Sequence, residues 1–457
     1  MRVGNLLLGG TNPIRIQSMA NTSTMDTEGS VAQAKRIVDA GGEIVRFTTQ
    51  GQREAQNMQH IKDQLRRDGY AVPLVADVHF NAAVADTAAT ICEKVRINPG
   101  NYVDPARTFK KLEYTDQEYA DEIKKIDQKF VPFLNICKQH HTAIRIGVNH
   151  GSLSDRIMSR YGDTPEGMVE SCMEFLRICV REQFTDIVIS IKASNTVVMV
   201  RTVRLLVAQM DKEGMAFPLH LGVTEAGDGE DGRIKSAVGI GALLCEGIGD
   251  TIRVSLSEAP EREIPVARKL VSFIPECAAL RETAKACITD DTVRIALQAE
   301  NLEDLQLKAA MATGALFIDG LAHKLEINAD GFEKSQLTDL ADSILQATRI
   351  KITKTEYISC PGCGRTLYNL EETIARIKSA IRDHAATDPR FSTLKIGIMG
   401  CIVNGPGEMA DADYGYVGAG VGKISLYKNK QCIEKNIPEA EAVDKLIAFI
   451  DADLTQK

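Results

Sequence analysis

The sequence predicts a (β/α)8 barrel of the TIM type, then a small, mostly helical insert and a C-terminal α+β domain. Short apolar segments alternate with helical patterns eight times between Ile14 and Leu256. Eight such units close more naturally into a barrel than into an open, doubly wound sheet, which remains the alternative. The chain has 457 residues, enough for two or three domains. We place the barrel at residues 1–260, the insert at 261–354 and the C-terminal domain at 355–457.

Eight short apolar segments are predicted as the barrel strands, and most of them precede a helical pattern. Ser30–Ala40 is followed by two glycines, which commonly end a helix. Pro165–Glu182, Val197–Lys212 and Ser236–Glu246 carry apolar residues at helical spacing. The predicted strands are Ile14–Met19, Glu43–Thr49, Pro73–Phe80, Lys94–Gly100, Ala143–Asn149, Asp186–Ser194, Pro218–Gly227 and Thr251–Leu256.

Polar side chains gather at the C-terminal ends of these strands, where active sites of this fold lie. A strand inside a barrel normally reads as an apolar run, so cationic and hydrogen-bonding groups on seven strands indicate a shared anionic ligand. The planar fork of arginine suits phosphate oxygens. A purely structural ion network is the alternative. The predicted mouth residues are Arg46, Asp77, His79, Arg96, Asn98, Arg145, Asn149, Lys192, His220, Thr224, Glu225, Arg253 and Ser255.

A further phosphate seat is predicted after the seventh strand. The segment Gly232–Ser236 precedes a helix. Backbone N–H groups at a helix start are free to bind an anion. We therefore add Lys235 and Ser236 to the expected substrate-binding residues.

The stretch from Cys360 to Glu408 carries the second set of chemical groups. Cys360 and Cys363 have C-x-x-C spacing, and Cys401 follows the apolar segment Lys395–Met399. Three thiolates and the Glu408 carboxylate could hold a [4Fe–4S] cluster with one reactive iron. The spacing alone leaves zinc, a redox C-x-x-C pair and unligated core thiols open, although structural zinc usually has four Cys or His ligands.

Longer motifs around these residues resemble a known family. S-C-P-G-C-G-R-T and G-C-I-V-N-G-P-G-E-M-A-D-A-D-Y-G-Y-V-G are similar to the cluster-domain signatures of the 4-hydroxy-3-methylbut-2-enyl diphosphate synthases of the non-mevalonate isoprenoid pathway. V-A-D-V-H-F, R-I-N-P-G-N, R-I-G-V-N-H-G-S-L, K-A-S, L-H-L-G-V-T-E-A-G and G-I-G-D-T-I-R-V-S-L resemble the barrel motifs of this family. The resemblance covers nearly all of residues 1–260 and 350–430.

The resemblance implies a [4Fe–4S] cluster held by Cys360, Cys363, Cys401 and Glu408, with Glu408 as a displaceable ligand. The implied substrate, 2-C-methyl-D-erythritol 2,4-cyclodiphosphate, would occupy the barrel mouth. Reductive ring opening and loss of a hydroxyl would give 4-hydroxy-3-methylbut-2-enyl diphosphate. A non-redox phosphate-binding barrel enzyme with a zinc-stabilised tail, or an iron–sulfur scaffold or sensor, is the alternative.

Further residues and partners follow from this interpretation. We expect Asn404 to contact the substrate and Glu225 to transfer a proton, because the departing hydroxyl must leave as water. A salt bridge from Glu225 to a mouth arginine is the alternative. The chain shows no flavin or nicotinamide fingerprint, so a ferredoxin or a flavodoxin is expected to supply the electrons.

The segment 261–354 departs from the short form of the family. Helical patterns occur at Ile264–Cys277, Glu303–Ala312 and Gln336–Ala347, and the segment Gly314–Leu321 is strand-like. We interpret the segment as a reduced version of the long-form insert, with a structural role. In the C-terminal domain, a hairpin is expected at Gly422–Ile437 and a closing helix at Pro438–Ala452.

Composition limits the partners and the location. No apolar run has the length of a membrane span, and no targeting segment precedes the first strand pattern, so a cytoplasmic protein is expected. The eleven cysteines should then be reduced. The net charge of −8 argues against nucleic acid or an anionic membrane as a partner. We expect a homodimer whose cluster domain caps the barrel of the other chain, with an open resting state.

Overall fold

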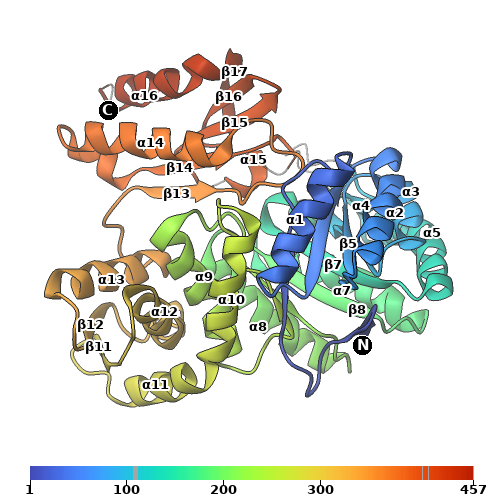
Figure 1. The fold of residues 1–457 in the computed structure, drawn as a ribbon, viewed down its shortest axis with the longest axis horizontal. Coiled ribbons are helices and arrows are strands. Elements are labelled where there is room, and N and C mark those ends of the chain that lie inside the picture. The colour runs from blue at the N-terminus through green and yellow to red at the C-terminus, as the bar shows by residue number, and fades with distance from the viewer. Residues whose placement is uncertain (106–111, 404, 410, 456–457) are drawn as a thin grey trace.

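The structure is a computed structural model that describes the chain except for residues 106–111, 404, 410 and 456–457. Three parts follow one another along the chain (Figure 1): a barrel in blue to green, an insert in yellow to tan, and a C-terminal domain in orange to red. Among the described residues, no helix is long and apolar enough to cross a membrane.

Eight parallel strands form the barrel, and this confirms the predicted fold class. The strands are β3 (Arg15–Met19), β4 (Ile44–Thr49), β5 (Leu74–Val78), β6 (Lys94–Ile97), β7 (Ala143–Asn149), β8 (Ile187–Lys192), β9 (His220–Leu221) and β10 (Thr251–Ile252). They pair in the order β8-β7-β6-β5-β4-β3-β10-β9. A parallel bridge between Ile189 and Leu219 joins the two ends of this series. Each predicted segment contains a strand, although β9 and β10 are much shorter than expected.

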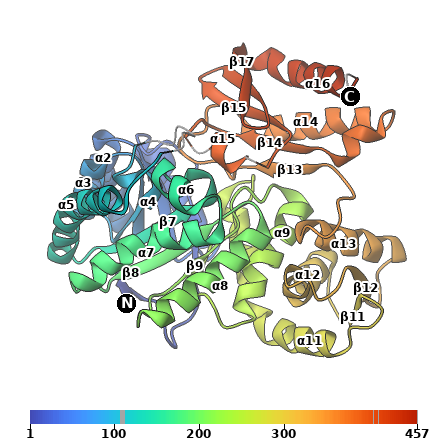
Figure 2. The same cartoon turned by 180° about the vertical axis from the view of Figure 1, so that it is seen from behind.

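Helices cover the outside of the barrel (Figures 1 and 2). Side chains in the turns after the strands begin several of them: Asp26, Asn81 and Asn195 each accept a hydrogen bond from a backbone N–H of the first helical turn. The helices are α1 (Thr27–Asp39), α2 (Gln52–Arg67), α3 (Ala82–Ala89), α4 (Pro99–Tyr102), α5 (Asp116–His140), α6 (Asp155–Tyr161), α7 (Pro165–Arg181), α8 (Thr196–Lys212) and α9 (Gly229–Leu244), with the 3-10 turn η1 (His150–Ser152).

An N-terminal hairpin lies at the opposite end of the barrel from the predicted site. It pairs β1 (Arg2–Val3) with β2 (Leu6–Leu7) in antiparallel fashion. Val3 and the following Leu8 pack against Ala143 and Val188, near the starts of β7 and β8. This apolar cluster closes the N-terminal end of the barrel. The polar side chains lie at the opposite end, where the strands end.

The insert packs its central helix, α12 (Leu302–Ile318), along α9 of the barrel. Its two parallel strands are β11 (Thr292–Ala296) and β12 (Lys324–Asn328). The prediction that Gly314–Leu321 is strand-like is wrong, because α12 continues to Ile318. Burial on nearly every side of α12 removes the polar stripe by which a surface helix is recognised. The remaining elements are η2 (Pro260–Arg262), α10 (Glu263–Ser272), α11 (Ile274–Ala286) and α13 (Lys334–Ala347).

The C-terminal domain is a five-stranded mixed sheet with helices, as expected. Its strands are β13 (Glu356–Ser359), β14 (Lys395–Met399), β15 (Tyr414–Gly420), β16 (Lys423–Lys428) and β17 (Gln431–Pro438), paired in that order. β13, β14 and β15 are parallel to one another, β16 is antiparallel to β15, and β17 is antiparallel to β16. The expected hairpin is β16 with β17, and α16 (Glu439–Thr455) is the closing helix. The other helical elements are α14 (Leu370–Ala385), η3 (Pro389–Thr393) and α15 (Gly405–Glu408).

Candidate active site

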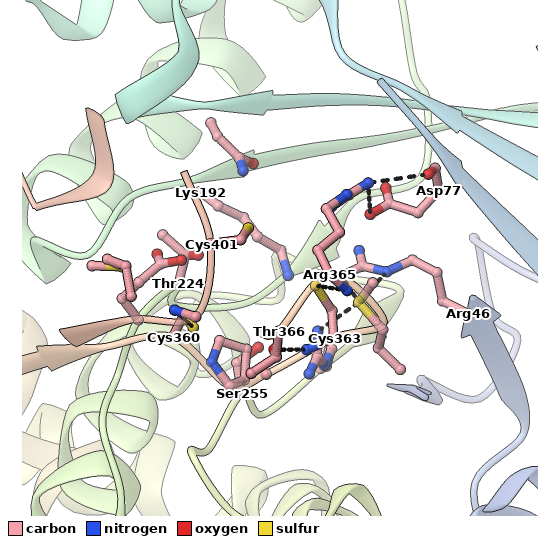
Figure 3. A pocket seen from close by; sticks show the side chains of 18 of the residues that line it. Arg46, Asp77, Lys192, Thr224, Ser255, Cys360, Cys363, Arg365, Thr366 and Cys401 are labelled. Atoms are coloured by element: carbon pink, nitrogen blue, oxygen red, sulfur yellow. Dashed lines mark hydrogen bonds and ion pairs between the residues drawn. The ribbon is translucent and has the colours of Figure 1, made fainter. Parts of the chain in front are cut away.

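A cavity lies between the barrel mouth and the C-terminal domain, and residues of both parts of the same chain line it (Figure 3). Most of the predicted mouth residues and all three predicted ligand thiols therefore meet in one space. The predicted residues that line it are Arg46, Asp77, His79, Arg96, Arg145, Asn149, Lys192, Thr224, Glu225, Arg253, Ser255, Cys360, Cys363 and Cys401.

Strand register explains why the mouth side chains converge. Arg96 of β6 pairs with Asp77 of β5 on one side and with Arg145 of β7 on the other. Asn149 pairs with Lys192 further along β7 and β8, nearer the mouth. Successive residues of a strand alternate between the two faces of a sheet, so charged residues at every second position point to the same side. In a closed barrel this side is the interior.

Among the described residues, three of the mouth cations have no acidic hydrogen-bonding partner. Arg145 is 1% exposed and donates to Ser190 Oγ at 2.8 Å, while its Nε and Nη2 have no partner among the described residues. Arg46 donates to the sulfur of Met19, at 3.1 Å from Nε and 2.7 Å from Nη2. In the part of the chain that the structure describes, Lys192 makes no hydrogen bond or ion pair. Buried charge without compensation is unfavourable, so the cavity is suited to a polyanion.

The other two mouth arginines are held by carboxylates. Arg96 donates to Asp77 Oδ1 at 3.0 Å, donates to the carbonyl of Gly147 at 2.9 Å and touches His79. Arg253 donates from Nη2 to Glu263 Oε1 at 3.0 Å and from Nε to Oε2 at 3.2 Å. These contacts fix both guanidinium groups before any ligand binds.

Burial also changes the ionisation of the mouth. It lowers the pKa of Arg46 to about 10, and it holds the pKa of Lys192 well below its ordinary value, with Arg46 and Arg145 adding to the effect. The pKa of His79 falls to about 3 because of burial and the neighbouring Arg96, so the ring is neutral. A bound anion would favour the charged form of Lys192.

The three thiols come from two loops of the C-terminal domain that meet over the mouth. Cys360 Sγ accepts a hydrogen bond from the Gly400 amide at 3.2 Å, and Cys363 Sγ accepts one from the Arg365 amide at 3.5 Å. Backbone N–H groups aimed at sulfur are a feature of iron–sulfur sites, where they tune the reduction potential. Burial raises the pKa of the Cys360 thiol to about 12 in the chain without metal.

The three thiols line one cavity, where a [4Fe–4S] cluster could bind. Within the described part of the chain, no three His, Cys, Asp or Glu side chains come close enough together to hold one metal ion. A zinc ion would need its sulfur ligands about 2.3 Å from a common centre. A [4Fe–4S] cluster binds each thiolate through a different iron and so suits thiols that surround a cavity without converging on a point.

Two carboxyl groups lie beside the cavity and are hydrogen-bonded to each other. Glu225 and Glu408 are 7% and 3% exposed, and one oxygen of each lacks a partner among the described residues. Burial raises the pKa of both groups, and Glu225 raises that of Glu408 further. Glu225 also has a φ of 49°, which residues other than glycine rarely adopt. A strained residue whose carboxyl has a raised pKa and lies at a cavity is typical of a functional group.

Comparisons with known proteins are consistent with this geometry. The family model described as "GcpE TIM-barrel domain" matches residues 1–268, and "GcpE protein C-terminal domain" matches 356–452. The chain belongs to the GcpE family. A relative from Bacteroides thetaiotaomicron is 53% identical over 99% of this chain and 97% of its own length, and one from Phocaeicola vulgatus is 53% identical over 100% and 98%.

Every one of these relatives has the same name. It is "4-hydroxy-3-methylbut-2-en-1-yl diphosphate synthase (flavodoxin)", and a third so named, from Porphyromonas gingivalis, is 45% identical over 98% of this chain and 96% of its own length. The predictions that the chain is a member of this family and an enzyme are confirmed. The alignment with the Bacteroides thetaiotaomicron relative has 601 positions, at least 144 more than the 457 residues of this chain. The GcpE relative thus carries residues that this chain lacks.

Some predicted residues of this GcpE chain lie outside the cavity. Asn98 caps α4 through the Gly100 amide and donates to Ser152 Oγ. His220 lies deeper in the barrel, 3.3 Å from Thr251 Oγ1. Ser236 is buried without lining the cavity. Asn404 lies outside the described residues.

Lys235 is also placed elsewhere. Its ammonium forms an ion pair with Glu356 of the C-terminal domain at 2.8 Å, and it does not line the cavity. The prediction that Gly232–Ser236 precedes a helix is wrong, because this segment lies inside α9, and the Lys235 cation is satisfied by a carboxylate of the same chain.

The expectation of a site shared between two chains with an open resting state is not what the structure shows. The C-terminal domain caps the barrel of its own chain, and its backbone touches the mouth directly. A Cβ on Gly151 would lie 2.4 Å from the Glu408 nitrogen, and a Cβ on Gly407 would lie 1.8 Å from the Gly151 oxygen. Glycine at both positions permits this approach. The insert packs beside the barrel, and the strand β13 that follows it lies at the mouth (Figure 2).

Several residues at the site were not predicted. Arg365 lines the cavity and reaches the Asp77 carbonyl at 3.5 Å. It lies two residues after Cys363, within the motif S-C-P-G-C-G-R-T, a position that could have drawn attention to it. Thr366 Oγ1 accepts a hydrogen bond from the Cys363 amide at 3.0 Å. Glu263, the partner of Arg253, carried no signal in the sequence, because only the fold brings α10 below the mouth.

Proposed function

We propose that this chain reduces 2-C-methyl-D-erythritol 2,4-cyclodiphosphate to 4-hydroxy-3-methylbut-2-enyl diphosphate, using a [4Fe–4S] cluster and electrons from flavodoxin. The reaction adds two electrons, opens the cyclic diphosphate and releases one hydroxyl as water. The names of the relatives support this activity for the family. The observation that carries the proposal for this chain is the single cavity in which mouth cations face three thiols.

The mouth cations bind and orient the diphosphate. Arg145, Arg46 and Lys192 have hydrogen-bonding capacity that no carboxylate uses. Arg96 and Arg253 are preset by Asp77 and Glu263. Asn149 and Ser255 add neutral polar groups to the lining. A bound polyanion would compensate the buried positive charge of the mouth. Part of the binding free energy would then come from removing the unfavourable electrostatic free energy of the unliganded protein.

Cys360, Cys363 and Cys401 would hold the cluster, with Glu408 as the fourth ligand. When bound, the cluster supplies electrons to the substrate one at a time. Glu408 is suited to a displaceable role because a carboxylate is a harder ligand than a thiolate. The Glu408 carboxyl is hydrogen-bonded to that of Glu225, so the two groups can share a proton.

Glu225 holds the proton that the departing hydroxyl needs. Its raised pKa keeps the carboxyl protonated at higher pH than an exposed glutamate, and its side chain lines the cavity. The hydrogen-bonding partners of the Glu225 carboxyl are Thr224 and Glu408, while the charges of Lys192 and Arg253 act on it without a hydrogen bond and lower its pKa less than burial raises it. We therefore assign it the role of acid.

The test is the spectrum and turnover of anaerobically purified full-length protein. A broad visible band that dithionite bleaches, together with conversion of the cyclic diphosphate by reduced flavodoxin, is expected. Cys401→Ser is the control and should lose both. Colourless protein with one zinc per chain would instead indicate a non-redox barrel enzyme. A cluster without binding of the cyclic diphosphate would indicate a scaffold or sensor.

A further inference from the structure

A buried ion cluster joins all three parts of the chain at the start of the strand that leads to Cys360. Glu356 opens β13 of the C-terminal domain, and its Oε1 lies 2.8 Å from Nζ of Lys235 on α9. Its Oε2 forms an ion pair with Arg349, which follows α13 of the insert. The Lys235 and Glu356 side chains are 8% and 7% exposed. No part of this cluster lines the cavity.

Glu356 is ionised in this setting. Burial alone would raise its pKa, but the charges of Lys235 and Arg349 and their hydrogen bonds outweigh burial, and the pKa lies below its ordinary value. A buried carboxylate and a buried ammonium that face each other are each costly when the other is removed. Lys235 is therefore satisfied only while β13 lies against α9 or while water reaches it.

The same strand carries the first cluster thiol. Three residues separate Glu356 from Cys360, and a parallel bridge pairs Ser359 with Ala226, next to Glu225. Ser257 Oγ lies 2.8 Å from both Ser359 Oγ and the Cys360 carbonyl oxygen. The position of β13 therefore sets the position of the Cys360 thiol relative to the mouth.

We propose that Lys235 and Glu356 are positioning residues: their ion pair holds β13, and with it Cys360, on the mouth of the same barrel. Neither residue lines the cavity between the mouth and the thiols. The buried mouth must open to admit a cyclic diphosphate and close before electrons can pass. The ion pair favours the closed arrangement because it exists only there. The proposal deepens the proposed function, since closure matters to turnover only if the thiols hold the redox group.

Hydrogen exchange of the full-length protein measures closure without turnover. Peptides that span the Ala226–Ser359 bridge exchange when the domains separate, and the exchange rate rises in proportion to the open population. Lys235→Met should speed this exchange roughly tenfold or more, because it removes a partner from a buried pair. Lys235→Arg should restore the wild-type rate. In a Glu356→Gln background, Lys235→Met should have little additional effect.

Arg204→Met is the matched control. Arg204 pairs with Glu246 and Asp319, joining the barrel to the insert without touching the C-terminal domain. It should leave exchange at the bridge unchanged. Peptides of β4 report unfolding of the barrel and should stay protected in every variant. If Lys235→Met unfolds the barrel, Lys235→Arg decides alone, and fast exchange at the bridge in that variant overturns the proposal.

Binding of inorganic diphosphate separates this role from the predicted phosphate seat. A positioning role leaves the affinity of Lys235→Met for diphosphate near that of wild type and lowers kcat with the cyclic substrate. A loss of diphosphate affinity equal to that of Arg145→Met would make Lys235 a ligand of the substrate and overturn the proposal. Wild-type exchange at the bridge in Lys235→Met would also overturn it. Hydrogen exchange and diphosphate affinity can both be measured even if the chain does not turn over the cyclic diphosphate. A failure of the proposed function can therefore be distinguished from a failure of the positioning role.

Discussion

Replacing the two most deeply buried mouth arginines by methionine should change stability in opposite directions. Arg145 and Arg253 are 1% and 2% exposed. Arg145 has one neutral partner, Ser190, and leaves Nε and Nη2 unpaired among the described residues. Arg253 donates two hydrogen bonds to the buried carboxylate of Glu263. The same substitution therefore removes an uncompensated cation in one case and half of an ion pair in the other.

The magnitudes follow from these contacts. Apolar residues that replace buried charges often stabilise a protein by about 1–4 kcal/mol, so Arg145→Met should raise the free energy of unfolding by an amount in this range. Loss of one member of a buried pair typically costs about 3–5 kcal/mol, so Arg253→Met should lower it by that much. Both variants should bind inorganic diphosphate roughly ten- to a hundredfold more weakly, because each loses charged hydrogen bonds to phosphate.

The assay is urea unfolding of the full-length chain in buffer without phosphate, followed by circular dichroism, with diphosphate affinity measured by calorimetry. Ser190→Ala, which removes the neutral partner of Arg145, is the control and should change stability by less than either methionine variant. If Arg145→Met destabilises the chain as strongly as Arg253→Met, the unpaired N–H donors of Arg145 do not destabilise the unliganded protein. The argument that the mouth is built for an anion would then lose its energetic basis.

Three further results are expected. Calorimetry in buffers of different ionisation enthalpy should show proton uptake when diphosphate binds, since the anion raises the lowered pKa of Lys192; affinity should fall as the pH rises, and Lys192→Arg should abolish the uptake. Cys401→Ser should lose the visible band of the cluster, because an alkoxide replaces thiolate poorly on iron, and full cluster content in that variant would contradict the ligand assignment. Gly407→Ala should open the mouth, because its Cβ would overlap the Gly151 oxygen, and small-angle scattering would detect the expansion; a profile identical to wild type would be inconsistent with this contact.

The barrel was predictable because its signals are local. Each strand is an apolar segment of the sequence. A cation such as Arg145 or Lys192 is conspicuous there because its neighbours in the segment are apolar. Register in a parallel barrel then brings such residues together without further information. The cysteines were predictable for a different reason: C-x-x-C spacing and a long glycine-rich motif restrict the chemistry.

The sequence could not predict contacts between residues that lie far apart in the chain, because only the fold brings them together. The segment Gly232–Ser236 reads as the start of a helix, but α9 already begins at Gly229, and the partner of Lys235, Glu356, lies 121 residues away in another domain. His220 occupies a strand of only two residues and lies below the cavity. Asn98 caps a short helix that the sequence did not indicate. Burial of α12 on nearly every side erased the periodicity that would have shown it as one helix.

The arrangement of cap and mouth within one chain leads to the last prediction. In a site shared between two chains, mixing Arg253→Ala protein with Cys401→Ser protein under subunit exchange would leave one intact site per heterodimer, so activity would return. In this structure the thiols face the mouth of the same chain, Gly151 meets Gly407, and Ser257 contacts the Cys360 carbonyl. Every chain of the mixture then keeps one lesion in its own site. We expect the mixture to remain as inactive as either parent, with wild-type protein carried through the same exchange as the control for recovery. Activity above the parents would show that the C-terminal domain can serve a neighbouring barrel, and closure within one chain would not be the active arrangement.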